Sequence, residues 1–282
     1  MQHNNGFADL ASRYDGFIVD LWGVVHDGVA PYPGAVDCLR RLRALGKRVV
    51  LLSNAPRRAD AAATGMRAMG IADNLYTGLV TSGEVTHRLL RDRDLPAFAA
   101  LGQRLYHLGP ERDRNVFAGL DVIRVERPDA ADFLLNTGPD DTRSPTDIGA
   151  YEDELQECRK AGLPMVCANP DLEVIRGGAR VICAGALAMR YAALGGAVLW
   201  VGKPDPAVYQ PVLDMLALPM TRVLAIGDAL RTDIAGAAAI GVDACWVLGG
   251  IHADDIGGPV AAEAAARSAG LAPVAALPAF RW

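Results

Sequence analysis

Two short runs of apolar residues in this chain each end on an aspartate. Residues 17–19 lead directly into Asp20, and residues 223–226 lead through Gly227 into Asp228. Unbroken apolar runs of this length are typical of strands that are buried on both faces of a parallel sheet. We therefore expect both aspartates at the carboxyl edge of one sheet, where their carboxylates can share a metal ion.

Segments with helical spacing of apolar residues separate the predicted strands. The first is expected over residues 35–45, with Val36, Leu39 and Leu42 on one face, and an apolar strand follows over residues 48–52. A strand, a helix and a strand of these lengths form a right-handed βαβ unit. Because the same alternation returns in the last third of the chain, the sequence predicts an α/β fold with a doubly wound, Rossmann-like, mostly parallel sheet.

The middle of the chain has strands and helices of its own. Strands are expected at residues 104–108, 122–125, 132–138 and 164–168, and helices at residues 84–91 and 150–161. These elements are enough for a small separate core. We therefore expect residues 83–185 to form an inserted, smaller α/β cap domain, and residues 1–82 and 186–282 to form the core domain.

The composition narrows the class of protein. Hydrophobic residues make up 51% of the 282 residues and charged residues 22%, which is typical of a globular protein and not of a disordered one. A net charge of −5 without any basic run argues against nucleic acid as a partner. Because no uncharged apolar run has the length of a membrane span or a signal-peptide core, we expect no membrane partner and a cytoplasmic location. The five widely spaced cysteines suit buried thiols in a reducing compartment.

Four short motifs, in order, resemble those of the haloacid dehalogenase-like superfamily. They are Asp20-x-Trp22-Gly23-Val24, Ser53-Asn54, Gly202-Lys203-Pro204 and Gly227-Asp228-x4-Asp233. The region between the second and third motifs, with Asn169-Pro170-Asp171 and Gly185-Ala186, is similar to subfamily IIA, which carries an α/β cap at that place. That subfamily includes nitrophenyl-phosphate, nucleotide and sugar-phosphate phosphatases. The resemblance covers nearly the whole chain.

The resemblance implies a role for each motif residue. Asp20 would be the nucleophile that forms an aspartyl-phosphate, and Lys203 would neutralise charge on the nucleophile and on the phosphate. Ser53, Asn54 and Asn169 would bind the phosphate or the rest of the substrate together with Lys203. Each residue also has an ordinary explanation on its own, such as a turn hydroxyl for Ser53, so the inference depends on the joint order of the motifs.

The resemblance also implies Mg²⁺ as the cofactor. Asp20, the backbone carbonyl of Trp22, Asp228 and Asp233 would hold the ion, and a set of oxygen ligands suits a hard cation. Asp233 has its own alternative explanation as an acidic residue at the start of a helix. The implied partner is a small-molecule phosphate ester, and we also expect a homodimer.

One position departs from the family pattern. Family phosphatases carry a second aspartate two residues after the nucleophile, which gives a proton to the leaving group and later takes one from water. Here that position is Trp22, which cannot transfer a proton, and His26 or Asp27 in the following loop are the candidates to replace it.

Three functions therefore stay open. A magnesium-dependent phosphatase is favoured, because all the other motif residues are present. The second is a non-catalytic protein that binds or senses a phosphate ester with the same site. The third is a hydrolase of a different bond, such as the bond from carbon to halogen.

Overall fold

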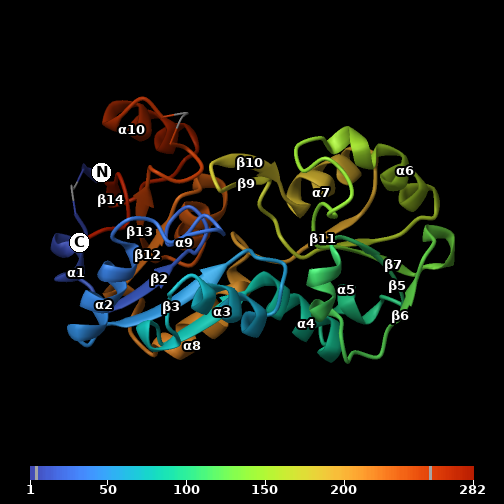
Figure 1. The fold of residues 1–282 in the computed structure, drawn as a ribbon, viewed down its shortest axis with the longest axis horizontal. Helices are drawn as coiled ribbons and strands as arrows, with labels where there is room; N and C mark the ends of the chain where they lie inside the picture. Colours follow the sequence, from blue (N-terminus) through green and yellow to red (C-terminus); the bar gives the residue numbers. More distant parts are fainter. Residues whose placement is uncertain (4–5, 254–255) are drawn as a thin grey trace.

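One half of the molecule is built on a wholly parallel sheet of seven strands (Figure 1). The computed structural model describes residues 1–3, 6–253 and 256–282. The strand order is β1-β14-β13-β12-β2-β3-β4. These strands are β1 (Gln2–His3), β2 (Gly16–Val19), β3 (Arg48–Ser53), β4 (Gly78–Thr81), β12 (Val223–Gly227), β13 (Asp243–Val247) and β14 (Ala275–Leu277).

Helices cover both faces of this sheet. In β2 the side chains of Phe17 and Val19 enter one hydrophobic core, whereas Ile18 enters the core on the opposite face. The first core is closed by α1 (Ala8–Ala11), α2 (Ala35–Ala44) and α3 (Ala59–Ala68), and the second by α8 (Gln210–Leu216), α9 (Ala235–Ala239) and α10 (Pro259–Ser268). The prediction of a doubly wound α/β core is therefore confirmed.

A second parallel sheet forms the other half of the molecule. Its strand order is β11-β8-β7-β5-β6. The strands are β5 (Arg104–Leu108), β6 (Ile123–Val125), β7 (Phe133–Asn136), β8 (Met165–Cys167) and β11 (Val198–Trp200). Buried residues of α6 (Glu152–Lys160) and α7 (Ala184–Ala193) pack on one face, and those of α4 (Ser82–Asp92) and α5 (Pro96–Ala99) on the other. This confirms the smaller α/β cap in the predicted fold class.

The cap sheet extends beyond the predicted boundary at residue 185. Strand β11 pairs with β8, with Val198 opposite Met165, and Tyr191 of α7 is buried in the cap core. The boundary was drawn from the local pattern around residue 185, but pairing between strands is a tertiary property that a local pattern does not show. The division at residue 185 stays a prediction, and the pairing favours a return to the core domain near Gly202.

Short helical turns connect these elements. They are η1 (Asp73–Leu75), η2 (Glu111–Val116), η3 (Pro128–Ala130), η4 (Ile148–Tyr151), η5 (Pro206–Val208), η6 (Met220–Arg222) and the π-turn η7 (Leu230–Ile234). Within the described ranges, the structure contains no helix that is both long enough and apolar enough to span a membrane.

A two-stranded antiparallel hairpin was not predicted from the sequence. It consists of β9 (Glu173–Arg176) and β10 (Ala179–Ile182), joined by Gly177 and Gly178 at positive φ. The signal was present, because two β-branched runs flank a Gly-Gly pair, which is typical of a tight hairpin turn. In Figure 1 the hairpin lies between the two halves of the molecule. The hairpin is therefore placed to cover the carboxyl ends of the core strands.

Candidate functional site

The carboxyl ends of β2 and β12 bring two aspartates to one place. The strands are neighbours, with Val19 opposite Ile226, and Asp20 and Asp228 directly follow their last residues. The chain winds to β3 on one side of this pair and to β13 on the other, so the pair is the topological switch point of the sheet. Open α/β sheets bind their ligands at such a point.

Lys203 connects Asp20 to a third carboxylate. Its Nζ lies 2.7 Å from Asp20 Oδ1 and 2.6 Å from Asp233 Oδ1, and it donates to the carbonyl of Leu52 at 3.2 Å. The lysine side chain is 3% exposed, so its ammonium group is desolvated and interacts with two carboxylates in place of water. Burial opposes its charge, but the carboxylates of Asp20 and Asp233 outweigh that cost and hold the pKa of Lys203 well above its usual value.

The backbone closes tightly around Asp228. A Cβ on Gly23, whose φ is +77°, would lie 1.8 Å from Asp228 Oδ2, and a Cβ on Gly250 would lie 2.1 Å from the same atom. The Ile251 amide donates to Oδ2 at 2.7 Å. Burial, reinforced by the charge of Asp233, raises the pKa of Asp228 to about 8 despite that hydrogen bond. Only glycine at positions 23 and 250 leaves room for this carboxylate.

The three aspartates form an oxygen cluster that suits a divalent cation. One carboxylate oxygen from each of Asp20, Asp228 and Asp233 lies within 4.8 Å of the others, and all three residues are buried. Burial and the neighbouring Asp233 raise the pKa of Asp20 well above its usual value, although Lys203 opposes this. Three buried carboxylates with one ammonium leave an excess of negative charge, which Mg²⁺ would offset. The backbone carbonyl of Trp22 accepts no hydrogen bond from the described part of the chain, so it is available as a further oxygen ligand.

The predicted phosphate-binding residues at the end of β3 differ in how their atoms are used. Ser53 is 1% exposed, and its hydroxyl accepts from the amide of Ala55 at 3.2 Å. Both ends of the Asn54 side chain bind protein: Oδ1 accepts from the Lys203 amide at 2.8 Å, and Nδ2 donates to Asp171 Oδ1 at 2.8 Å. The side chain of Asn54 therefore fixes the loop that carries Lys203, and its backbone amide is the group left for a phosphate oxygen.

Asn169 is not brought into the carboxylate cluster. Its Oδ1 accepts from the Asp171 amide at 2.9 Å, and it lines a separate cavity on the cap side of Trp22. Asp171 lines both cavities. Burial raises the pKa of Asp171, although Lys203 and Asn54 oppose the shift. The Asn-Pro-Asp turn thus contributes its aspartate, and not its asparagine, to the edge of the cluster.

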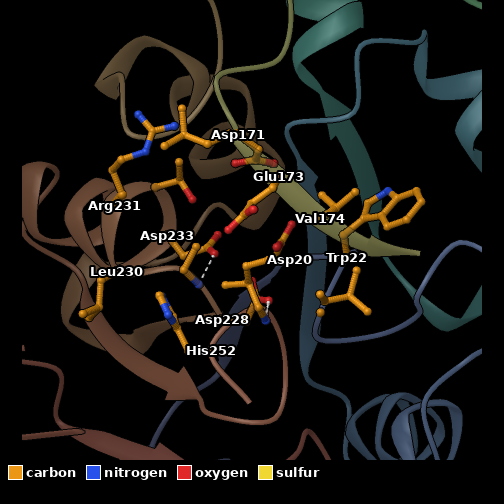
Figure 2. A pocket seen from close by; sticks show the side chains of 16 residues that line it. Asp20, Trp22, Asp171, Glu173, Val174, Asp228, Leu230, Arg231, Asp233 and His252 are labelled. Carbon is orange, nitrogen blue, oxygen red and sulfur yellow. Dashed lines mark hydrogen bonds between the residues drawn. The ribbon is translucent and has the colours of Figure 1, made fainter. Parts of the chain in front are cut away.

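The loop after Asp20 accommodates the indole ring of Trp22. A Cβ on Gly28 would lie 2.1 Å from the Trp22 ring, so the indole lies against this glycine, with His26 in edge contact. Figure 2 shows the indole directed away from the aspartates. His26 Nδ1 accepts from the Gly28 amide at 3.0 Å, and burial lowers the pKa of His26 to about 4. Asp27 Oδ1 accepts from two backbone amides of its own turn.

The cavity that contains the cluster is completed by the hairpin. Its volume is about 240 Å³, and its walls come from the core loops around Asp20 and Asp228 and from β9 of the cap. Figure 2 shows Glu173 and Val174 of β9 on the side of the cavity facing Asp20, with His252 on the core side. Neither hairpin residue was singled out from the sequence, because their place depends on the docking of the hairpin.

Comparison with known proteins gives the same family from two separate parts of the chain. A family model of haloacid dehalogenase-like hydrolases matches residues 17–123, and a second, HAD-hydrolase-like model matches residues 200–273. A solved hydrolase of the haloacid dehalogenase-like family from Brucella suis is 36% identical, with a TM-score of 0.84. This similarity covers 98% of this chain and 99% of that one.

Phosphatases are among the similar proteins. D-glycerol 3-phosphate phosphatase from Mycobacterium tuberculosis is 31% identical over 86% of this chain and 65% of its own length. A solved glycerol phosphate phosphatase from the same organism, in complex with magnesium, is 26% identical with a TM-score of 0.63. That similarity covers 86% of this chain and 70% of the other. These similarities span both halves of the molecule.

Proposed function

This chain belongs to the haloacid dehalogenase-like hydrolase family and to its phosphatases, and we propose that it hydrolyses a small phosphate ester with Asp20 as nucleophile. The observation that carries the proposal is the buried ammonium of Lys203 between Asp20 and Asp233. A lysine held in that position opposes the rise in the pKa of Asp20 and places a positive charge where a phosphoryl group would approach it.

The reaction has two steps on Asp20. A carboxylate oxygen of Asp20 forms a bond to phosphorus while the ester oxygen departs, and water then attacks the phosphorus of the aspartyl-phosphate and releases inorganic phosphate. The amides of Leu21, Trp22 and Asn54 donate no hydrogen bond within the described residues. They follow the two strand ends that flank the nucleophile, and together with Ser53 they supply donors for the phosphoryl oxygens.

The carboxylate cluster suits Mg²⁺ as the cofactor. Asp20, Asp228 and the Trp22 carbonyl would hold the ion, with Asp233 as a direct or water-mediated ligand. When bound, the ion neutralises charge on the phosphoryl group. In this arrangement Asp233 also orients Lys203, through the contact of 2.6 Å, and accepts the N–H of Ala229 at 3.1 Å.

Protonation of the leaving oxygen needs a group other than Trp22. His26 is neutral and bound to Gly28, and Asp27 is bound to its own turn, so neither side chain supports the substitution suggested by the sequence. Asp171 is the better candidate, because it lies where the two cavities meet, and burial favours its protonated form. Its Oδ1 is fixed by Asn54.

The test is steady-state hydrolysis of p-nitrophenyl phosphate with and without magnesium by wild type, Asp20→Asn and Trp22→Asp. Turnover in wild type that Asp20→Asn abolishes supports the phosphatase. An inert wild type with an active Trp22→Asp variant would instead favour a protein that binds a phosphate ester without turnover, or one that cleaves another bond. If neither wild type nor any variant hydrolysed the ester, the binding role alone would be favoured.

A further inference from the structure

A second cavity adjoins the carboxylate cluster on the cap side. It has a volume of about 150 Å³ and shares Trp22, Asp171 and Val174 with the first cavity. Its remaining walls include the core loop after β3, which carries Arg57, and the end of β9, which carries Arg176. A substrate whose phosphoryl group sits at Asp20 can therefore extend past Trp22 into this space.

The guanidinium groups of Arg57 and Arg176 donate no side-chain hydrogen bond within the described residues, although Arg57 forms a long ion pair with Asp113. Arg57 Nε lies 3.7 Å from Asp113 Oδ1, which is too long for a hydrogen bond, and Asp113 Oδ1 has no hydrogen-bond partner. Arg176 forms no ion pair or side-chain hydrogen bond with any residue that the structure describes. A third arginine on the same wall, Arg112, is already paired with Asp141.

The two cavities differ in charge. The first is lined by the carboxylates of Asp20, Asp228, Asp233 and Glu173, in addition to the shared Asp171, and by one arginine, Arg231. The second is lined by three arginines and two carboxylates. An anionic leaving group would be repelled from the first cavity and attracted to the second. Guanidinium groups with free donors are suited to paired hydrogen bonds with a carboxylate or a phosphate.

We propose that the second cavity recognises an anionic group on the leaving side of the substrate, held by Arg57 of the core and Arg176 of the cap. This inference rests on the proposed phosphatase function and names its substrate class: a phosphate ester that carries a second anion, a carboxylate or another phosphate. Because one arginine comes from each half of the molecule, such a substrate also joins the hairpin to the core while it is bound.

The experiment compares substrates that differ in that one group. Glycerol 3-phosphate is paired with 3-phosphoglycerate, which adds a carboxylate, and propane-1,3-diol monophosphate is paired with the bisphosphate, which adds a phosphate. In wild type we expect kcat/KM to be at least about 10-fold higher for an anionic member of one or both pairs. The pair with the larger ratio identifies which anion the cavity prefers. Ratios at or below one in both pairs would overturn the proposal.

Arginine variants assign the preference to the cavity. In Arg57→Gln and Arg176→Gln the ratio should fall by about 10- to 100-fold, mainly through KM for the anionic substrate. Arg127→Gln is the matched control, because that guanidinium is paired with Asp129 on the exposed surface of the cap and lines neither cavity, and it should keep the wild-type ratio. Equal losses for both members of a pair in the Arg57 and Arg176 variants would contradict recognition of the anion.

A binding measurement separates this proposal from the proposed function. Calorimetry with Asp20→Asn protein and the same substrate pairs requires no turnover. Tighter binding of the anionic members, lost in Arg57→Gln or Arg176→Gln on that background, would support the cavity even if no ester were hydrolysed. Equal binding of both members of each pair would overturn it, even if p-nitrophenyl phosphate were hydrolysed.

Discussion

The Oδ1 atom of Asn54 accepts the backbone N–H of Lys203 at 2.8 Å, across 149 residues of sequence. The amide of the same side chain donates to the Lys203 carbonyl at 3.3 Å and to Asp171 at 2.8 Å. One buried asparagine therefore joins the end of β3, the loop after β11 and the Asn-Pro-Asp turn. The position of the Lys203 ammonium depends on this contact, because Lys203 enters the core from the cap sheet.

Replacing Asn54 by alanine should lower kcat with little change in KM. Lys203 would keep its charge but lose the contact that fixes its backbone, and a displacement of that kind costs about 10- to 100-fold in rate. The change would also leave a buried N–H and the Asp171 carboxyl unpaired, which costs about 1–3 kcal/mol of stability each. Steady-state kinetics and urea unfolding measure the two effects.

The control for this prediction is Asn74→Ala, which removes an exposed asparagine from η1. It should change neither kcat nor the free energy of unfolding. A variant Asn54→Ala that is destabilised but keeps the wild-type kcat would show that the contact is structural only.

Magnesium should stabilise the wild type, and Asp228→Asn should abolish that effect. Burial raises the pKa of the Asp228 carboxyl to about 8, so without metal this group prefers its neutral form, and the neutral amide of the variant should leave the chain at least as stable as wild type. At a magnesium concentration about 100-fold above Kd, binding contributes about 2.7 kcal/mol, or roughly 5 °C or more in Tm. Thermal unfolding with EDTA or Mg²⁺ measures it without any turnover.

Asp129→Asn, on the exposed surface of the cap, serves as the control and should keep the full response to magnesium. An equal rise in Tm for wild type and Asp228→Asn would place the ion elsewhere. Activity should follow the same pattern, with loss in EDTA and recovery when Mg²⁺ is restored.

Acid should destabilise the folded chain through two buried histidines. Burial lowers the pKa of both His26 and His107 from 6.5 to about 4. As the pH falls below 6.5, the unfolded chain binds protons that the folded chain does not, so stability is present above pH 6.5 and is lost between pH 6.5 and 4. At pH 5 the loss is about 2 kcal/mol for each histidine.

Urea unfolding of wild type and His26→Asn at about pH 8 and pH 5 isolates the contribution of His26. Asparagine keeps an acceptor near Nδ1 for the Gly28 amide but does not titrate. The loss of stability between the two pH values should be about 2 kcal/mol smaller in the variant. Equal losses would mean that His26 is not held neutral by its surroundings.

The alternation of strands and helices and the place of the two strand-end aspartates were predictable from local patterns, whereas the strand order and the cap side of the site were not. Asp20 and Asp228 were placed at one sheet edge because each ends an apolar run, and a parallel sheet aligns such ends. The hydrogen bonds of the Asn54 side chain could not be predicted from the sequence, since its partners lie 117 and 149 residues away. Arg57 and Arg176 were not singled out for the same reason: an arginine next to a turn is ordinary until a docked hairpin gives it a cavity.

Trp22→Asp should raise activity most for esters with poor leaving groups. The indole rests on Gly28 and contributes no proton, so esters of alcohols, which leave as strong bases, are expected to be the slowest substrates in wild type. A carboxyl group at position 22 would protonate the leaving oxygen, and general acid catalysis of this kind contributes about 10²- to 10⁴-fold. The gain in kcat/KM should therefore be larger for glycerol 3-phosphate than for p-nitrophenyl phosphate.

The matched control is Trp22→Asn, which opens the same space over Gly28 but carries no proton to donate. If Trp22→Asn raised the rate on both esters as much as Trp22→Asp does, the indole would act by obstructing the site, and the missing acid would not limit the reaction. If instead only the aspartate variant flattens the dependence of rate on leaving-group pKa, the acid limits the natural enzyme. Asp171→Asn then completes the comparison. If this substitution lowers the rate of the otherwise wild-type protein but not that of the Trp22→Asp variant, Asp171 is the group that protonates the leaving oxygen in wild type.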